Sequence, residues 1–98
     1  MVDLAIDRRR LGDFCRQRHI RRLALFGSAL RDDFGPESDV DVLVEFEPGR
    51  TPGLAFFGIQ DELSEFLGRR VDLNTPNSLS PHFRDQVLRE AKELYVAS

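Results

Sequence analysis

The sequence contains a single cysteine, Cys15, and no tryptophan among its 98 residues. One cysteine excludes an internal disulfide and a cysteine-based metal cluster. No Cys-x-x-Cys motif accompanies Cys15, so we expect it to be a small core residue rather than a reactive thiol. The two histidines, His19 and His82, share no spacing with other metal ligands, and we expect neither to bind a metal.

Long hydrophobic runs are also missing. No run approaches the roughly 18 apolar residues that a membrane-spanning helix requires. The first ten residues are too polar for a secretory signal. We therefore expect a cytoplasmic protein that contacts no membrane.

A positive charge excess is lacking as well, since the net charge is −3. This balance argues against direct binding of nucleic acid. Half of the 14 basic residues nonetheless precede position 23. We expect them to form a solvated helix face, with a docking surface for an acidic partner as the alternative. These seven residues are Arg8, Arg9, Arg10, Arg16, Arg18, Arg21 and Arg22.

The residues that are present suit a soluble globular protein, because 41% are hydrophobic and 32% are charged. The length leaves room for one domain, residues 1–98, with one modest core. Strand and helix patterns alternate along the chain and predict an α/β fold, a small mixed β-sheet flanked by helices in the order α-β-α-β-α-β-α. The predicted helices cover Asp3 to Arg18, Ser28 to about Asp33, Thr51 to Gly68 and Ser80 to Tyr95, and the predicted strands cover Ile20 to Phe26, Asp39 to Phe46 and Arg70 to Asn74.

The most informative pattern is Gly27-Ser28 followed, after ten residues, by Asp39-Val40-Asp41. Glycine lets the backbone approach a phosphate closely, and the free amides at the start of a following helix favour negative charge. The hydroxyl of Ser28 can add a hydrogen bond. In a strand, Asp39 and Asp41 face the same side with Cα atoms about 6.5 Å apart, close enough to bind the same ions.

Two carboxylates so close repel each other, and a divalent cation between them relieves the repulsion. Carboxylate oxygens and substrate phosphates suit Mg²⁺, and two ions are expected for an in-line displacement. Asp72, on the next predicted strand, can complete the acidic cluster and act as base toward an incoming hydroxyl. The site therefore requires Asp39, Asp41 and Asp72 as metal ligands and catalytic residues.

Two further side chains are candidates for the nucleotide site. Arg31 lies one turn after Ser28 and can donate to phosphate oxygens, although an ordinary surface arginine fits equally well. Ser38 can orient Asp39 by a hydrogen bond or only shape the loop. The structural alternative for the acids is that Asp39 ends a turn and Asp41 lies on a solvent-facing strand surface.

Phe26-Gly27-Ser28-Ala29-Leu30-Arg31 and Ser38-Asp39-Val40-Asp41-Val42-Leu43-Val44 together resemble the polymerase-beta-like nucleotidyltransferases, and their minimal branch most of all. The resemblance extends from about Ile20 to Tyr95. It implies ATP with Mg²⁺, Gly27 and Ser28 at the phosphates, and metal-binding roles for Asp39, Asp41 and Asp72. Many relatives have Ala-Arg-Gly where this chain has Leu30-Arg31-Asp32, which puts the phosphate role of Arg31 in doubt.

Members of this branch are commonly paired with a HEPN-type ribonuclease toxin, and antitoxins of the MntA type silence that toxin by transferring AMP to a tyrosine. The resemblance therefore implies an antitoxin that works in a hetero-oligomer or as a homodimer and depends on a partner for missing contacts. Two other functions stay open: a binding module that neutralises its partner by contact alone, and a transferase acting on a small molecule. The last is weaker, because the chain has no room for a separate substrate domain.

Overall fold

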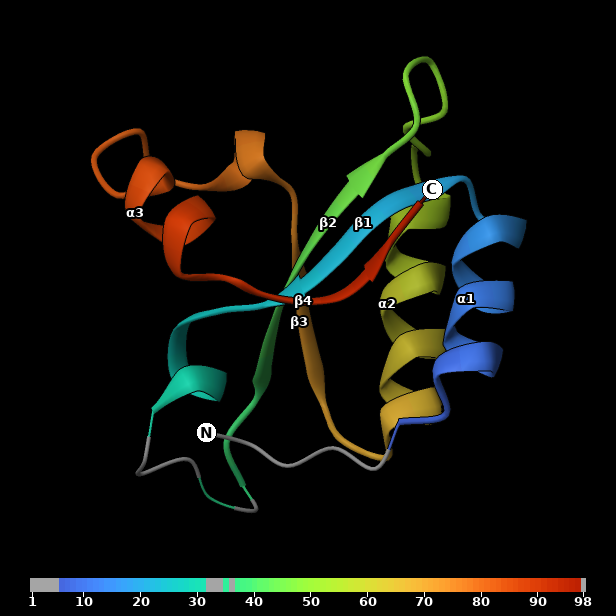
Figure 1. Cartoon of the computed structure of the whole chain (residues 1–98), viewed down its shortest axis with the longest axis horizontal. Helices are drawn as coiled ribbons and strands as arrows, with labels where there is room; N and C mark the ends of the chain where they lie inside the picture. Colours follow the sequence, from blue (N-terminus) through green and yellow to red (C-terminus); the bar gives the residue numbers. More distant parts are fainter. Residues whose placement is uncertain (1–5, 32–34, 36, 98) are drawn as a thin grey trace.

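The computed structural model describes residues 6–31, 35 and 37–97. Helices and strands alternate along the chain, as Figure 1 shows. The elements are α1 (Arg8–Gln17), β1 (Ile20–Leu25), the 3-10 helix η1 (Gly27–Leu30), β2 (Val40–Phe46), α2 (Ala55–Leu67), β3 (Val71–Asn74), the 3-10 helix η2 (Pro76–Ser78), α3 (Arg84–Glu90) and β4 (Lys92–Val96).

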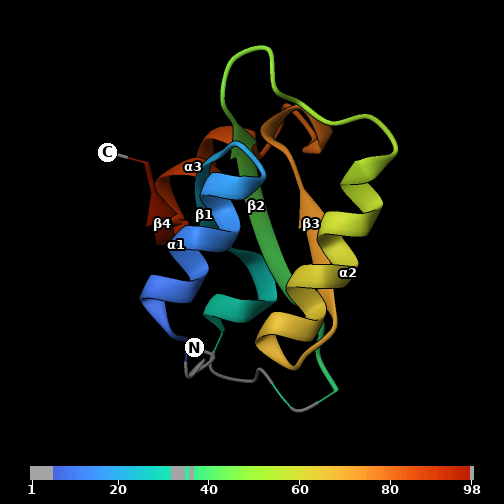
Figure 2. The ribbon, with the colours of Figure 1, turned by 90° about the vertical axis from the view of Figure 1, so that its right-hand side faces the viewer.

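The four strands form one mixed sheet in the order β3-β2-β1-β4. β1 is antiparallel to both β2 and β4, whereas β2 and β3 are parallel. Helices α1 and α2 lie side by side on one face of the sheet, and α3 lies on the other (Figure 2). The predicted small mixed sheet flanked by helices is confirmed.

Both faces of β2 are buried along its middle. Val40, Val42 and Val44 are fully buried in the main core, on the side that α1 and α2 cover. Leu43 points the other way, into a smaller cluster with Phe26 and Leu79 that α3 covers. Because successive side chains of a strand point to opposite faces of the sheet, the three valines share one face, as predicted, and Asp41 shares the other face with Leu43.

Helix α1 begins after Asp7, whose side chain accepts hydrogen bonds from the backbone N–H groups of Arg9 and Arg10 at 3.0 and 3.2 Å. An aspartate at this position satisfies amides that have no partner within the helix. The predicted start at Asp3 lies outside the described residues.

Cys15 is fully buried in the core. Its burial raises the pKa of the thiol to about 12, although the charges of Arg18 and Arg16 act to lower this pKa. It is the core residue that the sequence predicts.

The predicted last helix, Ser80 to Tyr95, is wrong in its second half. Helix α3 ends at Glu90, Ala91 is not helical, and the chain continues as β4. A single helix is incompatible with the packing, because Ala91 packs on the Leu43 cluster whereas Leu94 is buried in the main core on the opposite face of the sheet. The free edge of β1 offers backbone hydrogen bonds to this segment, and pairing there overrides its helical spacing.

The other predicted boundaries need smaller corrections. The helix expected from Ser28 to about Asp33 is a 3-10 helix that ends at Leu30, since Arg31 is extended, and Asp33 lies outside the described residues. Ser28 does not cap this helix, because its hydroxyl turns toward Asp39 and Asp41. Helix α2 starts at Ala55 rather than at Thr51, and its last residue is Leu67; Gly68, the predicted end, caps it with a φ of 68°.

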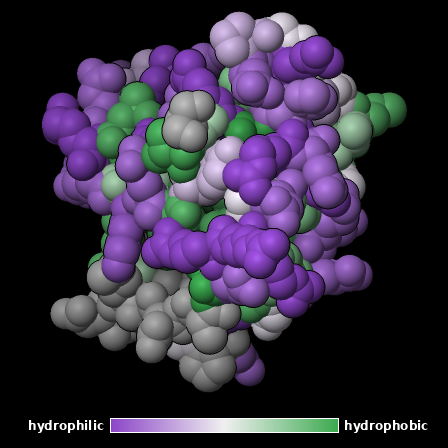
Figure 3. All heavy atoms as spheres, turned by 45° about the vertical axis from the view of Figure 1, so that its right-hand side comes forward, coloured by the Kyte–Doolittle hydropathy of each residue, from purple (hydrophilic) through white to green (hydrophobic). Residues whose placement is uncertain are grey.

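Intramolecular contacts engage most of the arginines before position 23. Arg8 donates to the carbonyl of Leu94 at 2.6 Å, and Arg18 pairs with Glu62. Arg16, Arg21 and Arg22 also form ion pairs. These contacts favour the interpretation as a solvated and internally paired surface, and the face shown in Figure 3 is largely hydrophilic with separate hydrophobic patches. None of the described helices has the length and apolar character that crossing a membrane requires.

Candidate active site

The turn after β1 is built around Gly27. Its φ is +59°, in the left-handed region where a side chain is unfavourable. A Cβ atom at this position would lie 2.5 Å from Oδ2 of Asp41, closer than non-bonded atoms approach. The glycine is therefore required both by the backbone angle and by the carboxylate that lies against it.

Ser28 binds the same carboxylate. Its backbone N–H donates to Oδ2 of Asp41 at 3.1 Å, and its Oγ lies 3.0 Å from that oxygen and 3.1 Å from the carbonyl oxygen of Asp39. The backbone N–H of Phe26 also donates to the carbonyl of Asp41 at 3.0 Å. The Gly27-Ser28 turn thus holds the half-buried side chain of Asp41 from two sides. These hydrogen bonds bring together the two segments from which the sequence predicts the site.

Asp72 lies beside Asp41 in the sheet. The two residues are register partners in the parallel pair β2–β3, with Val71 and Leu73 buried on the opposite face. Two carboxylates at the same level on one face repel each other. Asp72 is exposed, so it is free to reach a substrate or an ion from the end of its strand.

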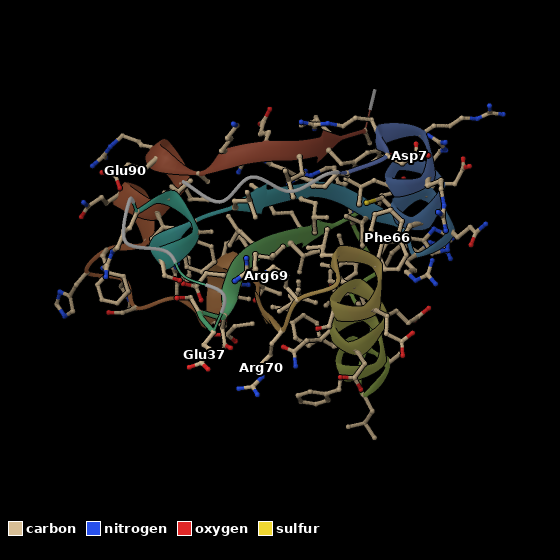
Figure 4. The ribbon with its side chains drawn as sticks, turned by 90° about the horizontal axis from the view of Figure 1, so that it is seen from below. Asp7, Glu37, Phe66, Arg69, Arg70 and Glu90 are labelled. Atoms are coloured by element: carbon tan, nitrogen blue, oxygen red, sulfur yellow. The ribbon has the colours of Figure 1, made fainter. Side chains whose placement is uncertain are left out.

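Asp39 lies just before β2 and is less constrained. The nearest basic group is the guanidinium of Arg70, whose Nη1 is 3.7 Å from Oδ1 of Asp39, and the two side chains are 82% and 45% exposed. An ion pair this open to water contributes little to stability. Figure 4 shows Arg70 and Glu37 projecting from this end of the sheet, where the parallel strands β2 and β3 begin.

The three carboxylates fit a Mg²⁺ site in their chemistry, since they offer hard oxygen ligands from two neighbouring strands. In the part of the chain that the structure describes, no three acidic, histidine or cysteine side chains stand close enough together to hold a metal ion. Oδ2 of Asp41 is instead hydrogen-bonded to Ser28. Metal binding therefore stays a prediction for Asp39, Asp41 and Asp72.

Ser38 and Arg31 make local contacts in the structure, and their places in the nucleotide site stay predictions. The Oγ of Ser38 accepts a hydrogen bond from the backbone of Gly35 at 3.1 Å, so it shapes the loop, which is the second of the two roles considered for it. Arg31 is exposed, and its described hydrogen bond is from its backbone N–H to the carbonyl of Ser28 at 3.1 Å. Its role at the phosphates stays a prediction.

The sequence analysis missed Arg69. Its Nη2 donates to the carbonyl of Gly35 at 2.5 Å and lies 3.4 Å from the carbonyl of Ser38, so it ties the loop before Asp39 to the start of β3. Figure 4 shows this side chain beside the start of β2. Arg69 stands two positions before β3, next to a second arginine, and nothing in this local sequence indicates its contact with the distant loop.

The sequence and the geometry agree with a known family. A family model described as the nucleotidyltransferase domain matches residues 8–94. The chain belongs to this family. The nucleotidyltransferase predicted from Gly27-Ser28 and the three aspartates is thereby confirmed at the level of the family.

Relatives of this nucleotidyltransferase extend the comparison. The protein adenylyltransferase MntA of Thermococcus cleftensis is 40% identical over 72 residues, which cover 72% of this chain and 71% of that protein. A crystal structure of a toxin-antitoxin with AMP-PNP contains a chain of the same fold, with a TM-score of 0.72 and 22% identity over 95% of this chain and 76% of that one.

A second structure contains a tri-AMPylated Shewanella oneidensis HEPN toxin in complex with an MNT antitoxin. The matched chain has a TM-score of 0.63 and 23% identity, over 92% of this nucleotidyltransferase and 70% of that chain. At such identities the two structures establish the shared fold. The predicted nucleotidyltransferase fold is therefore confirmed, together with the predicted mixed sheet.

Proposed function

We propose that this nucleotidyltransferase transfers AMP from ATP to a hydroxyl group of a HEPN-type toxin, with a tyrosine as the acceptor, and so acts as an antitoxin. The observation that carries the proposal is the contact of Gly27 and Ser28 with Asp41, the register partner of Asp72. It places an amide and a hydroxyl, suited to phosphate, beside two carboxylates. The relative named protein adenylyltransferase MntA and the AMPylated toxin structure support the choice of AMP and of the acceptor.

The transfer requires one bond to form and one to break. The acceptor oxygen attacks the α-phosphorus of ATP, the bond from this phosphorus to the bridging oxygen breaks, and pyrophosphate leaves with the electron pair. The hydroxyl proton passes to the carboxylate of Asp72, which is exposed and faces the same side as Asp41. The N–H and Oγ of Ser28 then donate to phosphate oxygens, once Asp41 has turned away from them.

Asp39, Asp41 and Asp72 are the residues that would hold Mg²⁺. The ion would neutralise charge on the phosphates and favour departure of pyrophosphate. Asp39 and Asp41 would hold the nucleotide-bound ion, and Asp72 would contribute to a second one. Removing divalent cations with a chelator should abolish the transfer while leaving the protein folded.

The decisive experiment incubates the protein with ATP labelled at the α-phosphate, Mg²⁺ and a HEPN-type toxin from the same organism. We expect label on the toxin, and a loss of about 100-fold or more in the transfer rate for Asp72→Asn, because a positioned base contributes that much. Asp61→Asn is the matched control, since Asp61 is an exposed acid on α2, on the opposite face of the sheet. Absence of label from a folded wild type would refute the proposed activity.

A second function is supported by the contacts of Asp41. Its carboxylate already has partners within the chain, so the acids are also compatible with a module that neutralises a toxin by contact alone. The double variant Asp39→Asn/Asp41→Asn separates the two functions. It should abolish protection of cells from the toxin if AMP transfer is required, and leave protection intact if binding is sufficient.

A further inference from the structure

A hollow lies between η1 and α3, next to the proposed phosphate site. Phe26, Gly27, Leu30 and Arg31 form one side of it, and Phe83, Gln86, Val87 and Glu90 form the other. Its volume is about 410 Å³, within the range typical of small-molecule sites. Gly27 lines the hollow and also lies against the carboxylate of Asp41, so the hollow adjoins the turn that holds this acid.

One face of α3 lines the hollow. Phe83, Gln86, Val87 and Glu90 are spaced i, i+3, i+4 and i+7, so they share one side of the helix. Figure 4 shows Glu90 next to η1, at the end of α3. Val87 also packs on the cluster of Phe26, Leu43 and Leu79, whereas the other three residues are exposed, so this face offers both apolar and polar groups to a ligand.

Phe83 is the unusual member of this face. Its side chain is 50% exposed, although a phenyl ring gains free energy by burial. The start of α3 is nevertheless fixed, because Arg84 donates to the carbonyls of Pro76 and Leu79 at 2.7 and 3.1 Å. The ring is therefore held at the edge of the hollow with one part open to a ligand.

The polar groups of the hollow also suit a base. The amide of Gln86 donates to a carboxylate oxygen of Glu90 at 3.2 Å. The carboxylate of Glu90 keeps further lone pairs, so it can accept from an exocyclic amino group. Adenine has such a group, and an aromatic ring is the usual partner for the face of a base.

We propose that the hollow between η1 and α3 binds the adenine base of ATP, with Phe83 stacked on the base and Glu90 accepting from its amino group. This inference rests on the proposed function, since it assigns the nucleotide's base to a place beside the site of its phosphates. A nucleotide is one continuous molecule, so its base pocket must adjoin the phosphate site, and Gly27 borders both.

Isothermal titration calorimetry with the full chain tests the inference. The ligands are ATP and inorganic tripolyphosphate, each with Mg²⁺, and the variants are Phe83→Ala, Phe83→Trp and Phe57→Ala. Phe57 is the control, because it is 62% exposed on α2, across the sheet from α3. Thermal unfolding of each variant verifies that it is folded.

We expect Phe83→Ala to weaken ATP binding about tenfold and to leave tripolyphosphate binding unchanged, because only ATP has a base to stack. Phe83→Trp should bind ATP at least as tightly as wild type, and Phe57→Ala should change neither affinity. ITP, in which an oxygen replaces the amino group, should bind more weakly than ATP, and Glu90→Gln should reduce that difference.

The outcomes separate the two claims. If wild type binds neither ATP nor tripolyphosphate, the proposed function fails and the base site with it. If wild type binds ATP and Phe83→Ala binds it equally well, the base site alone is overturned. The base site is also overturned if Phe83→Ala slows AMP transfer without changing the affinity for ATP. In that case the hollow binds the acceptor of the AMP group rather than the base.

Discussion

Gly27 shows how one residue couples the backbone to the proposed chemistry. Its φ of +59° and the 2.5 Å between a Cβ atom and Oδ2 of Asp41 act against any side chain. We expect Gly27→Ala to lose about 1 to 2 kcal/mol from the backbone angle and a further amount from displacing Asp41. AMP transfer should fall with it, because Asp41 can no longer lie against the turn.

Gly49→Ala is the matched control for this substitution. Gly49 has a φ of +76° and no atom within 4 Å of a Cβ, so it carries the cost of the backbone angle alone. Urea unfolding of both variants measures the difference, which we expect to be larger for Gly27→Ala. Equal losses of stability would show that Asp41 tolerates a methyl group at this position.

The aspartates and the Gly27-Ser28 step could be predicted because their signal is local. A glycine between a strand and a polar segment indicates a turn, and acids that alternate with valines indicate a strand with one polar face. Both patterns extend over only a few residues. Arg69 could not be found in this way. Its partners, the carbonyls of Gly35 and Ser38, are backbone groups more than thirty positions earlier in the chain, and nothing in the side chains of those residues marks them.

At the scale of elements, α2 protects the outer edge of β3 with two side chains. Oε1 of Gln60 accepts from the N–H of Leu73 at 2.9 Å, and Oγ of Ser64 accepts from the N–H of Val71 at 3.0 Å. These N–H groups point away from β2, and exposed edge groups of this kind invite pairing with other chains. The same contacts fix the strand that carries Asp72 opposite Asp41.

We expect Gln60→Ala to destabilise the fold by about 1 to 2 kcal/mol, because it leaves the N–H of the buried Leu73 without its partner. Urea denaturation measures the change. Gln17→Ala, at the exposed end of α1, should alter stability by less than about 0.5 kcal/mol. A Gln60→Ala protein as stable as the wild type would mean that water replaces the glutamine at this edge.

A helix or strand could be predicted from the sequence where the spacing of its apolar residues matches the face that it buries in the core. Helix α2 and strands β1, β2 and β3 meet this condition, and their predicted positions are close to those observed. The segment after Ala91 does not, because its apolar residues fit a helix as well as a strand. Its structure depends on the free edge of β1, which is a property of the assembled sheet rather than of the segment.

At the scale of the molecule, the proposed site lies at one end of the sheet and is open. Arg70 is largely exposed and Asp39 is about half exposed, and the hollow beside Gly27 lies between η1 and α3 at the surface. Transfer chemistry is favoured when water is excluded. An acceptor protein that covers this end would exclude it, which agrees with the predicted dependence on a partner.

The ionic network across the sheet links the stability of the whole fold to pH. Glu45 on β2 accepts from Arg22 and Arg21 of β1 at 3.1 and 2.8 Å, and Arg22 also donates to Glu93 of β4 at 3.0 Å. Burial acts to raise the pKa of Glu45, but the hydrogen bonds from Arg22 and Arg21 outweigh it and hold the pKa below its ordinary value of 4.5.

A carboxyl group whose pKa is lower in the folded protein stabilises the fold above its unfolded pKa, and this contribution disappears as the pH falls through the folded value. Glu45→Gln should therefore lower stability by about 1 kcal/mol at pH 7. The difference from wild type should shrink below pH 4.5, the ordinary value for this group. Thermal unfolding from pH 7 to pH 3 measures it, with Glu65→Gln on the exposed side of α2 as the control. A difference that is constant over this range would show that the glutamate acts by packing rather than by its charge.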